Sequence, residues 1–172
     1  MLTDDQYTFQ WKDIGLIDEG RPNLGNLTSV STYRLMQYSL RSILNNRYGA
    51  DEARKIFFEA GELAGKEFCK NMLNCELDFY SFISQLQEVL LEQKMGILRF
   101  EKTNLETMNF TLVVAEDLDC SGLPITDETV CNYDEGFIGG IFHVFTRKDF
   151  NVNEVDCWSK GDRVCRFEVS LR

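Results

Sequence analysis

Residues 153–169 read NEVDCWSKGDRVCRFEV, and this stretch decides how the C-terminal part of the chain folds. The polar turn SKGD separates two runs of strand-forming residues, so the stretch predicts a β-hairpin. Side chains alternate along a strand, which places Cys165, Phe167 and Val169 on one face. Cys157 and Cys165 flank the turn at nearly equal distances. We therefore expect them to be cross-strand neighbours.

Two more strands are predicted upstream of this hairpin. The segments GILRFEK (96–102) and TMNFTLVVA (107–115) alternate apolar and polar residues. A period of two is typical of a strand with one buried face. A loop that contains Asp117, Asp119 and Cys120 follows the second segment.

Three amphipathic helices are predicted before these strands. Apolar residues recur at helical spacing over residues 33–48, and Gly49 stands where this helix should end. The second helix is expected to begin near Asp51 and the third near Asp78, because Asp is a good N-cap residue.

A fourth helix is predicted over residues 132–147, NYDEGFIGGIFHVFTR, where Asn132 and Glu135 have the spacing of a capping box. Its GFIGG segment and the AGELAG segment (60–65) of the second helix place glycines inside helices, at a cost of about 1 kcal/mol each against Ala. Close helix packing and room for a ligand both explain them. GFIGG is not a phosphate loop, because it lacks the Lys-Ser/Thr of the P-loop.

The order of these elements predicts the fold class. YTFQWKDIGLI (7–17) predicts a short N-terminal strand, and the DEGRPNLGN segment after it predicts a turn. Helices, a hairpin, a helix and a second hairpin then follow. We therefore predict an α+β fold in which an antiparallel sheet is packed against helices.

The charge balance limits the partners of the protein. Lys and Arg number 18 and Asp and Glu number 28, which gives a formal net charge of −10. This field repels phosphate backbones and anionic bilayers, so we expect no nucleic acid and no membrane as partners. The acidic N-terminus is unlike a signal peptide, so we expect a cytoplasmic protein whose six cysteines are free thiols or metal ligands.

The hairpin supplies most of a metal site. Glu154 and Cys157 are three residues apart, so in a regular strand they would face opposite sides, and a shared site requires a bulge. A fourth ligand is also needed. Cys131 precedes the fourth helix, where the helix dipole favours a thiolate, and Cys120 on the preceding loop is the rival. The alternative is that the cysteines simply fill the core.

The run from Cys131 to Val169 resembles the 4-vinyl-reductase domain. That family has a helix-opening cysteine, a G-F-x-G-G-like segment, an acidic residue, a second cysteine, a K-G-D turn and a final C-R-F. The matching residues here are Cys131, GFIGG (136–140), Glu154, Cys157, KGD (160–162) and CRF (165–167). Related aromatic-sensing domains of bacterial activators bind zinc through three cysteines and a glutamate. Their spacing matches positions 131, 154, 157 and 165.

The resemblance implies a domain over residues 25–172, with residues 1–24 as an N-terminal strand and turn segment. It implies a structural zinc held by Cys131, Glu154, Cys157 and Cys165. The wider fold is similar to the ligand-binding domains of nitric-oxide signalling proteins and to subunits of the TRAPP vesicle-tethering complex. A homodimer is also implied.

The function implied is binding of a hydrocarbon or aromatic molecule, with a signal or cargo passed to a partner protein. Thirteen Phe residues are many, and most must form the core. We expect Phe82, Phe100, Phe110 and Phe137 to line a ligand cavity between sheet and helices. Two alternatives stay open: a component of a reductase that acts on a vinyl-bearing tetrapyrrole, and a protein-assembly module. A non-enzymatic role is preferred, because no nicotinamide or flavin motif is present.

Overall fold

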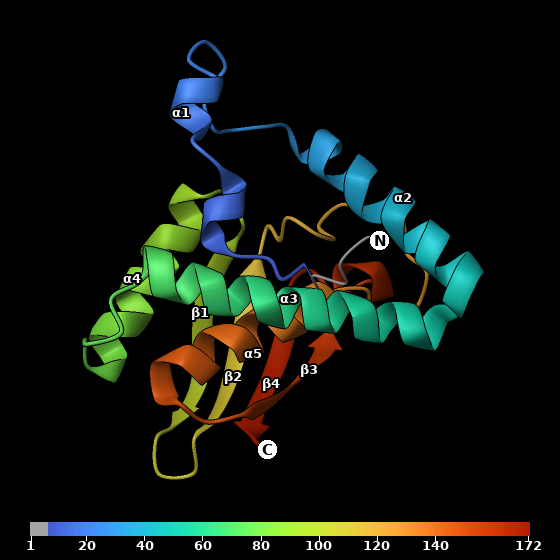
Figure 1. Cartoon of the computed structure of the whole chain (residues 1–172). Helices are drawn as coiled ribbons and strands as arrows, with labels where there is room; N and C mark the ends of the chain where they lie inside the picture. Colours follow the sequence, from blue (N-terminus) through green and yellow to red (C-terminus); the bar gives the residue numbers. More distant parts are fainter. Residues whose placement is uncertain (1–6) are drawn as a thin grey trace, which may run out of the picture.

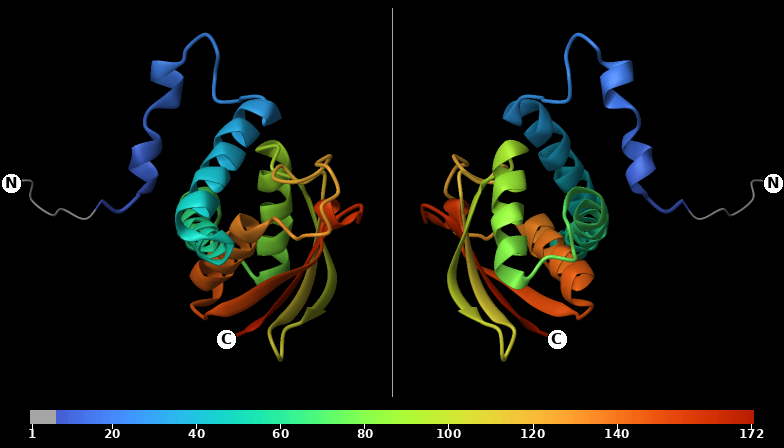
Figure 2. Two further views of the ribbon diagram at one scale, coloured as in Figure 1. Left: turned by 90° about the vertical axis from the view of Figure 1, so that its right-hand side faces the viewer. Right: turned by 90° about the vertical axis from the view of Figure 1, so that its left-hand side faces the viewer.

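The computed structural model describes residues 7–172 and has the predicted α+β architecture. A twisted antiparallel sheet forms one layer, helices α4 and α5 lie on one face of it, and α3 and α2 lie outside α5 (Figures 1 and 2). None of the helices within residues 7–172 is both long and apolar enough to span a bilayer.

The sheet contains the four predicted strands of the C-terminal half. These strands are β1 (Ile97–Asn104), β2 (Asn109–Ala115), β3 (Phe150–Asp156) and β4 (Cys165–Leu171). Their order is β1-β2-β4-β3, and each neighbouring pair is antiparallel. Alternate residues of β3 and β4 are buried under the helices, as the period of two predicts.

The first three predicted helices are α2 (Val30–Tyr48), α3 (Ala50–Met72) and α4 (Phe79–Glu92). Gly49 ends α2 with a φ of 86°, a conformation that glycine adopts without strain. The same Gly49 is the N-cap of α3, so the prediction that Asp51 is the cap is wrong by two residues. The Asp78 side chain caps α4 by accepting the backbone N–H groups of Tyr80 and Ser81.

The fourth predicted helix is α5 (Asn132–Thr146), and its N-cap is Cys131. The predicted capping box is therefore wrong, because Asn132 already lies inside the helix. Glu135 instead accepts the backbone N–H of Glu154 at 2.7 Å, which ties the first turn of α5 to β3.

The predicted N-terminal strand is wrong within the described residues, and residues 1–6 lie outside them. Trp11–Ile14 forms a short 3-10 helix and Ile17–Gly20 forms α1. These elements stand away from the sheet (Figure 2). The apolar alternation of this segment is too short to specify a strand when no sheet edge receives it. The backbone N–H of Trp11 instead donates to Glu67 on α3.

Close packing between α3 and α5 explains the helical glycines. A Cβ atom on Gly61 would lie 2.0 Å from the carbonyl oxygen of Tyr133, and one on Gly136 would lie 2.0 Å from that of Phe58. Such separations are far below any contact distance, so only glycine allows the two backbones to approach this closely. Of the two interpretations of these glycines, helix packing is confirmed.

Candidate functional site: a cysteine cluster beside an apolar cavity

Four cysteine side chains converge at one end of the sheet, and all four are fully buried. Their sulfur atoms lie within 4.8 Å of one another. Cys120 comes from the loop after β2, Cys131 from the start of α5, Cys157 from the end of β3, and Cys165 from the start of β4. The structure thus brings together the three cysteines predicted as ligands and adds Cys120.

A bulge in β3 directs Cys157 toward the cluster. Glu154 pairs with Phe167 and Asp156 with Arg166, so the register shifts between Glu154 and Asp156. A shared site for Glu154 and Cys157 required such an irregularity, and it is present. The short 3-10 helix Trp158–Lys160 then turns the chain toward β4, and Gly161 ends it with a φ of 99°.

Ser159 ties this turn to the loop that carries the other two cysteines. Its hydroxyl lies 3.2 Å from Cys157 Sγ and donates to the carbonyl of Glu128. Its carbonyl accepts the backbone N–H groups of Thr126 and Asp127. The loop between Cys120 and Cys131 is therefore held against the hairpin by backbone hydrogen bonds.

Glu154 lies at the edge of the cluster and binds a backbone group in it. Its Oε2 accepts the backbone N–H of Cys131 at 3.1 Å, while its buried Oε1 has no hydrogen-bond partner in the described part of the chain. Burial raises the pKa of Glu154 to about 8, and contact with Cys157 adds to the shift. Glu154 is not among the groups whose ligand atoms all lie within 4.8 Å of one another.

The donor set fits a tetrahedral thiophilic metal. A zinc–sulfur bond of about 2.3 Å places the sulfurs of a tetrahedral site roughly 3.8 Å apart. The Cys131–Cys157 and Cys131–Cys165 sulfur distances are 3.9 and 3.8 Å, although Cys120 and Cys165 lie closer, at 3.0 Å. All four are free thiols, and a disulfide would require about 2.05 Å.

The thiols share protons unequally. Hydrogen bonds from the other three thiols, that of Cys120 first, lower the pKa of Cys157. Hydrogen bonding within the cluster and burial raise the pKa of Cys131. A thiolate, not a thiol, is the form that binds a metal, so the cluster already favours the ligating form at one of its four positions.

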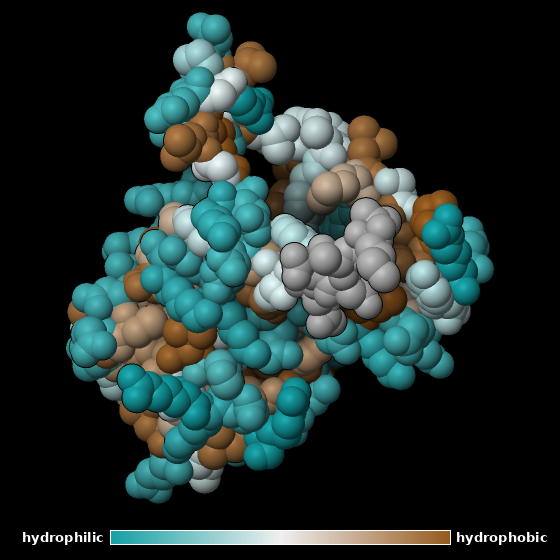
Figure 3. Space-filling view, in the orientation of Figure 1, coloured by the Kyte–Doolittle hydropathy of each residue, from teal (hydrophilic) through white to brown (hydrophobic). Residues whose placement is uncertain are grey.

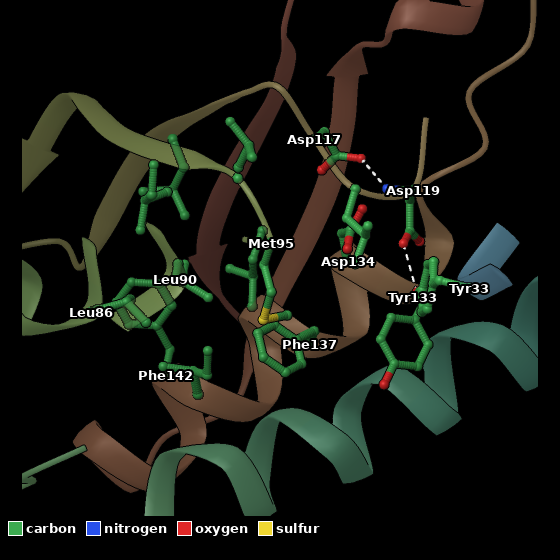
Figure 4. Close-up of a pocket in the computed structure, with 17 residues that line it drawn as sticks. Tyr33, Leu86, Leu90, Met95, Asp117, Asp119, Tyr133, Asp134, Phe137 and Phe142 are labelled. Atoms are coloured by element: carbon green, nitrogen blue, oxygen red, sulfur yellow. Dashed lines mark hydrogen bonds between the residues drawn. The ribbon is translucent and has the colours of Figure 1, made fainter. Parts of the chain in front are cut away.

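An apolar cavity lies next to the cluster, between α4, α5 and the sheet. Its volume is about 60 Å³. Its apolar wall combines aliphatic side chains of α4 and the sheet with Phe137, Ile141 and Phe142 of α5 (Figure 4). A single water needs about 10–15 Å³ of such space, so the cavity has room for more than one small group.

One end of the cavity is acidic. Asp117, Asp119 and Asp134 lie here, with Tyr33 and Tyr133 beside them (Figure 4). Asp119 accepts the Tyr33 hydroxyl at 2.8 Å and the Gln37 amide at 2.6 Å. Burial and the neighbouring Asp119 raise the pKa of Asp117 to about 7. Burial, followed by the other carboxylates, raises that of Asp134 well above its usual value.

The residues expected to line a ligand cavity are divided by the structure. Phe137 is part of this cavity wall. Phe82, Phe100 and Phe110 are not, because their rings pack against other phenylalanines. Phe82 stacks on Phe145 with ring centroids 3.8 Å apart, and Phe110 stacks on Phe142 at 5.2 Å. These rings form core between the sheet and helices α4 and α5.

The sequence prediction missed the acidic end of the cavity. Asp134 precedes Phe137, Ile138 and Ile141 by three, four and seven residues, which places it on the same face of α5. That spacing was a usable signal. The contribution of Asp117 and Asp119 had no such local signal, since a loop with acidic residues is ordinarily a solvated turn.

Comparison with known proteins confirms the family resemblance. Residues 110–171 match the model of the 4-vinyl-reductase domain. An uncharacterised protein of Methanocaldococcus jannaschii is 29% identical over 150 residues, which are 86% of this chain and 81% of that protein. A vinyl-4-reductase family protein of the same organism has a similar structure, with a TM-score of 0.60 and 17% identity over 86% of this chain and 84% of that one.

Three other solved structures confirm the fold class. The phenol-responsive sensory domain of the transcription activator PoxR has a TM-score of 0.67 at 15% identity and covers 85% of this chain and 76% of its own. A trafficking protein particle complex subunit 3 from Naegleria fowleri gives 0.65 at 12%, covering 83% and 95%. An H-NOX protein from S. oneidensis gives 0.53 at 11%, covering 79% and 74%. At these identities the similarity shows the fold alone.

Proposed function

We propose that this protein, which carries a 4-vinyl-reductase domain, binds a hydrophobic or aromatic small molecule in the cavity and a structural zinc in the cysteine cluster. The observation that carries the proposal is the position of α5. Cys131 at its start belongs to the cluster, and Phe137 and Ile141 one and two turns later line the cavity. A metal in the cluster would therefore fix the helix that shapes the ligand site.

Zinc would be held by Cys120, Cys131, Cys157 and Cys165. This set keeps three of the residues implied by the family resemblance and exchanges Glu154 for Cys120, whose sulfur lies 3.0 Å from that of Cys165. Four protein ligands leave no position for water, so the metal would contribute folding free energy and not Lewis-acid chemistry. Glu154 would hold the backbone N–H of Cys131 and thereby orient this ligand.

The similarity to a phenol-responsive sensory domain supports the choice of ligand class, and so does the apolar wall of the cavity. A dry cavity of about 150 Å³ accepts benzene, so the present volume of about 60 Å³ requires side chains such as Met95 to move aside for a ring. A tetrapyrrole is several times larger. The size of the cavity therefore favours a binding function over the alternative of a tetrapyrrole reductase component.

A second copy of the chain is the partner that we propose for α2. This helix exposes Leu35, Met36, Leu40 and Ile43, with relative exposures of 73%, 63%, 48% and 50%. Apolar side chains of this kind are visible at the surface along α2 (Figure 3). Contiguous exposed apolar surface marks an interaction site. We propose that residues 25–172 form the dimerising ligand-binding domain and that residues 1–24 are an N-terminal segment.

Two measurements on protein purified from its native host test the proposal. Native mass spectrometry should show about one zinc per chain and a retained hydrophobic molecule, and extraction followed by mass spectrometry should identify that molecule. Metal-free protein that keeps its full stability would contradict the zinc assignment. A protein that carries no small molecule and binds no aromatic probe would contradict the binding function.

A further inference from the structure

The acidic end of the cavity has a charge that the protein itself does not neutralise. Asp117 is 5% exposed and Asp119 is 3% exposed, and neither forms a salt bridge within residues 7–172. Asp134 Oδ2 is buried and has no hydrogen-bond partner in the same part of the chain. Burying an acceptor without a partner costs about 1–3 kcal/mol, so this arrangement is expected to serve a ligand.

The nearest cationic side chains are used for other contacts. Arg34 donates to the backbone carbonyls of Leu118 and Ser121 at 2.8 and 2.9 Å. Arg41 donates to the carbonyl of Val130 at 2.8 Å and lies over the ring of Phe57, 4.3 Å from its centroid. Both arginines reduce the field at Asp119, but neither pairs with a carboxylate of the cavity.

We propose that the ligand is an amine, with its apolar body against the wall formed by Leu86, Phe137 and Ile141 and its ammonium group at Asp134, beside Asp117 and Asp119. This inference rests on the proposed small-molecule-binding function and specifies its ligand. An ammonium group has three donors and a positive charge. It would give Asp134 Oδ2 the partner that it lacks and offset the charge of the carboxylates.

Other ligand classes leave this end of the cavity unsatisfied. A hydrocarbon would leave Asp134 Oδ2 without a donor. A hydroxyl would supply one hydrogen bond without offsetting charge. An anionic ligand would be repelled by three carboxylates and by a chain with a formal net charge of −10. A metal ion bound by Asp117, Cys131 and Asp134, whose ligand atoms also lie within 4.8 Å, would need a thiol that the cysteine cluster already uses.

Four probes of nearly equal size separate these classes: benzylamine, benzyl alcohol, toluene and benzoate. Calorimetry with the full chain should show the tightest binding for benzylamine and none for benzoate. Asp134→Asn should weaken benzylamine binding by at least roughly tenfold and leave toluene binding unchanged, because only the ion pair is lost. Zinc content of the variant should equal that of the parent, which separates this effect from a change in the cluster.

Asp149→Asn is the matched control. It removes one negative charge just beyond the other end of α5, from a side chain that is 61% exposed. It should leave benzylamine binding unchanged. Equal weakening by both variants would overturn the inference, and so would tighter binding of benzyl alcohol or toluene than of benzylamine by the parent; the binding function would stand in both cases. Binding of none of the probes, by the parent or by an Ile141→Ala variant with a larger cavity, would overturn the binding function as well.

Discussion

Glu154 Oε2 accepts the backbone N–H of Cys131 at 3.1 Å, across 23 positions of the sequence. This hydrogen bond joins the end of β3 to the start of α5. It places the carboxylate behind Cys131 and leaves the fourth side of the sulfur cluster to Cys120, which lies 3.0 Å from Cys165. The roles of Glu154 and Cys120 are therefore separable by mutation.

Replacing Cys120 by Ser should remove the metal. Its sulfur is one of four within 4.8 Å, and a hydroxyl is a poor replacement for a thiolate on zinc. We expect less than one zinc per chain by elemental analysis and a lower melting temperature, as for the Ser variants of Cys131, Cys157 and Cys165. Ser variants of Cys69 and Cys75, whose sulfurs lie 3.5 Å from each other, are the controls and should keep the metal. Full zinc content in Cys120→Ser would restore Glu154 as the fourth ligand.

Glu154→Gln should keep the zinc, because a Gln oxygen can still accept the N–H of Cys131. Glu154→Ala should lower the free energy of unfolding by about 1–3 kcal/mol, since it leaves a buried backbone donor without a partner. Urea denaturation with the zinc content measured alongside checks both variants. Loss of zinc in the Gln variant would show that the carboxylate itself is the ligand.

Gly136 and Gly139 of α5 provide a matched pair for the packing of α3 against α5. A Cβ atom on Gly136 would lie 2.0 Å from the carbonyl oxygen of Phe58, whereas one on Gly139 would be 3.6 Å from its nearest neighbour on Val152. Gly136→Ala should destabilise the protein by about 1–3 kcal/mol or more, because the helices must separate.

Gly139→Ala should be neutral or stabilise by up to about 1 kcal/mol, because alanine has the higher helix propensity. Chemical denaturation of both variants measures the difference. Equal stabilities for the two variants would mean that α3 and α5 are farther apart than the structure places them.

Phe110→Ala should cost about 3–5 kcal/mol of stability, as expected for a large core side chain. Phe110 is 3% exposed, and its ring contacts the rings of Phe79 and Phe142 at centroid distances of 5.3 and 5.2 Å. A ring that lined an unfilled cavity would have fewer neighbours and would cost less. Denaturation measures the loss, and a small loss with altered uptake of an aromatic probe would return Phe110 to the ligand site.

The sequence by itself determined the features that depend on local spacing. The alternation in residues 96–102 and 107–115 predicts β1 and β2, and Asp78 predicts the start of α4 because its side chain caps the helix. The need for an irregularity near Glu154 also followed from the sequence, since residues three apart in a regular strand face opposite sides.

The tertiary structure alone decided which residues meet. Cys120 joins Cys165 across 45 positions because β2 pairs with β4, with Val114 opposite Cys165, so the loop after β2 lies beside the start of β4. The same pairing brings Asp117 and Asp119 to Asp134 at the start of α5. It also decided that Phe110 packs as core while Phe137 lines the cavity. Local periodicity shows which face of an element is buried, but only the assembled sheet and helices determine what that face contacts.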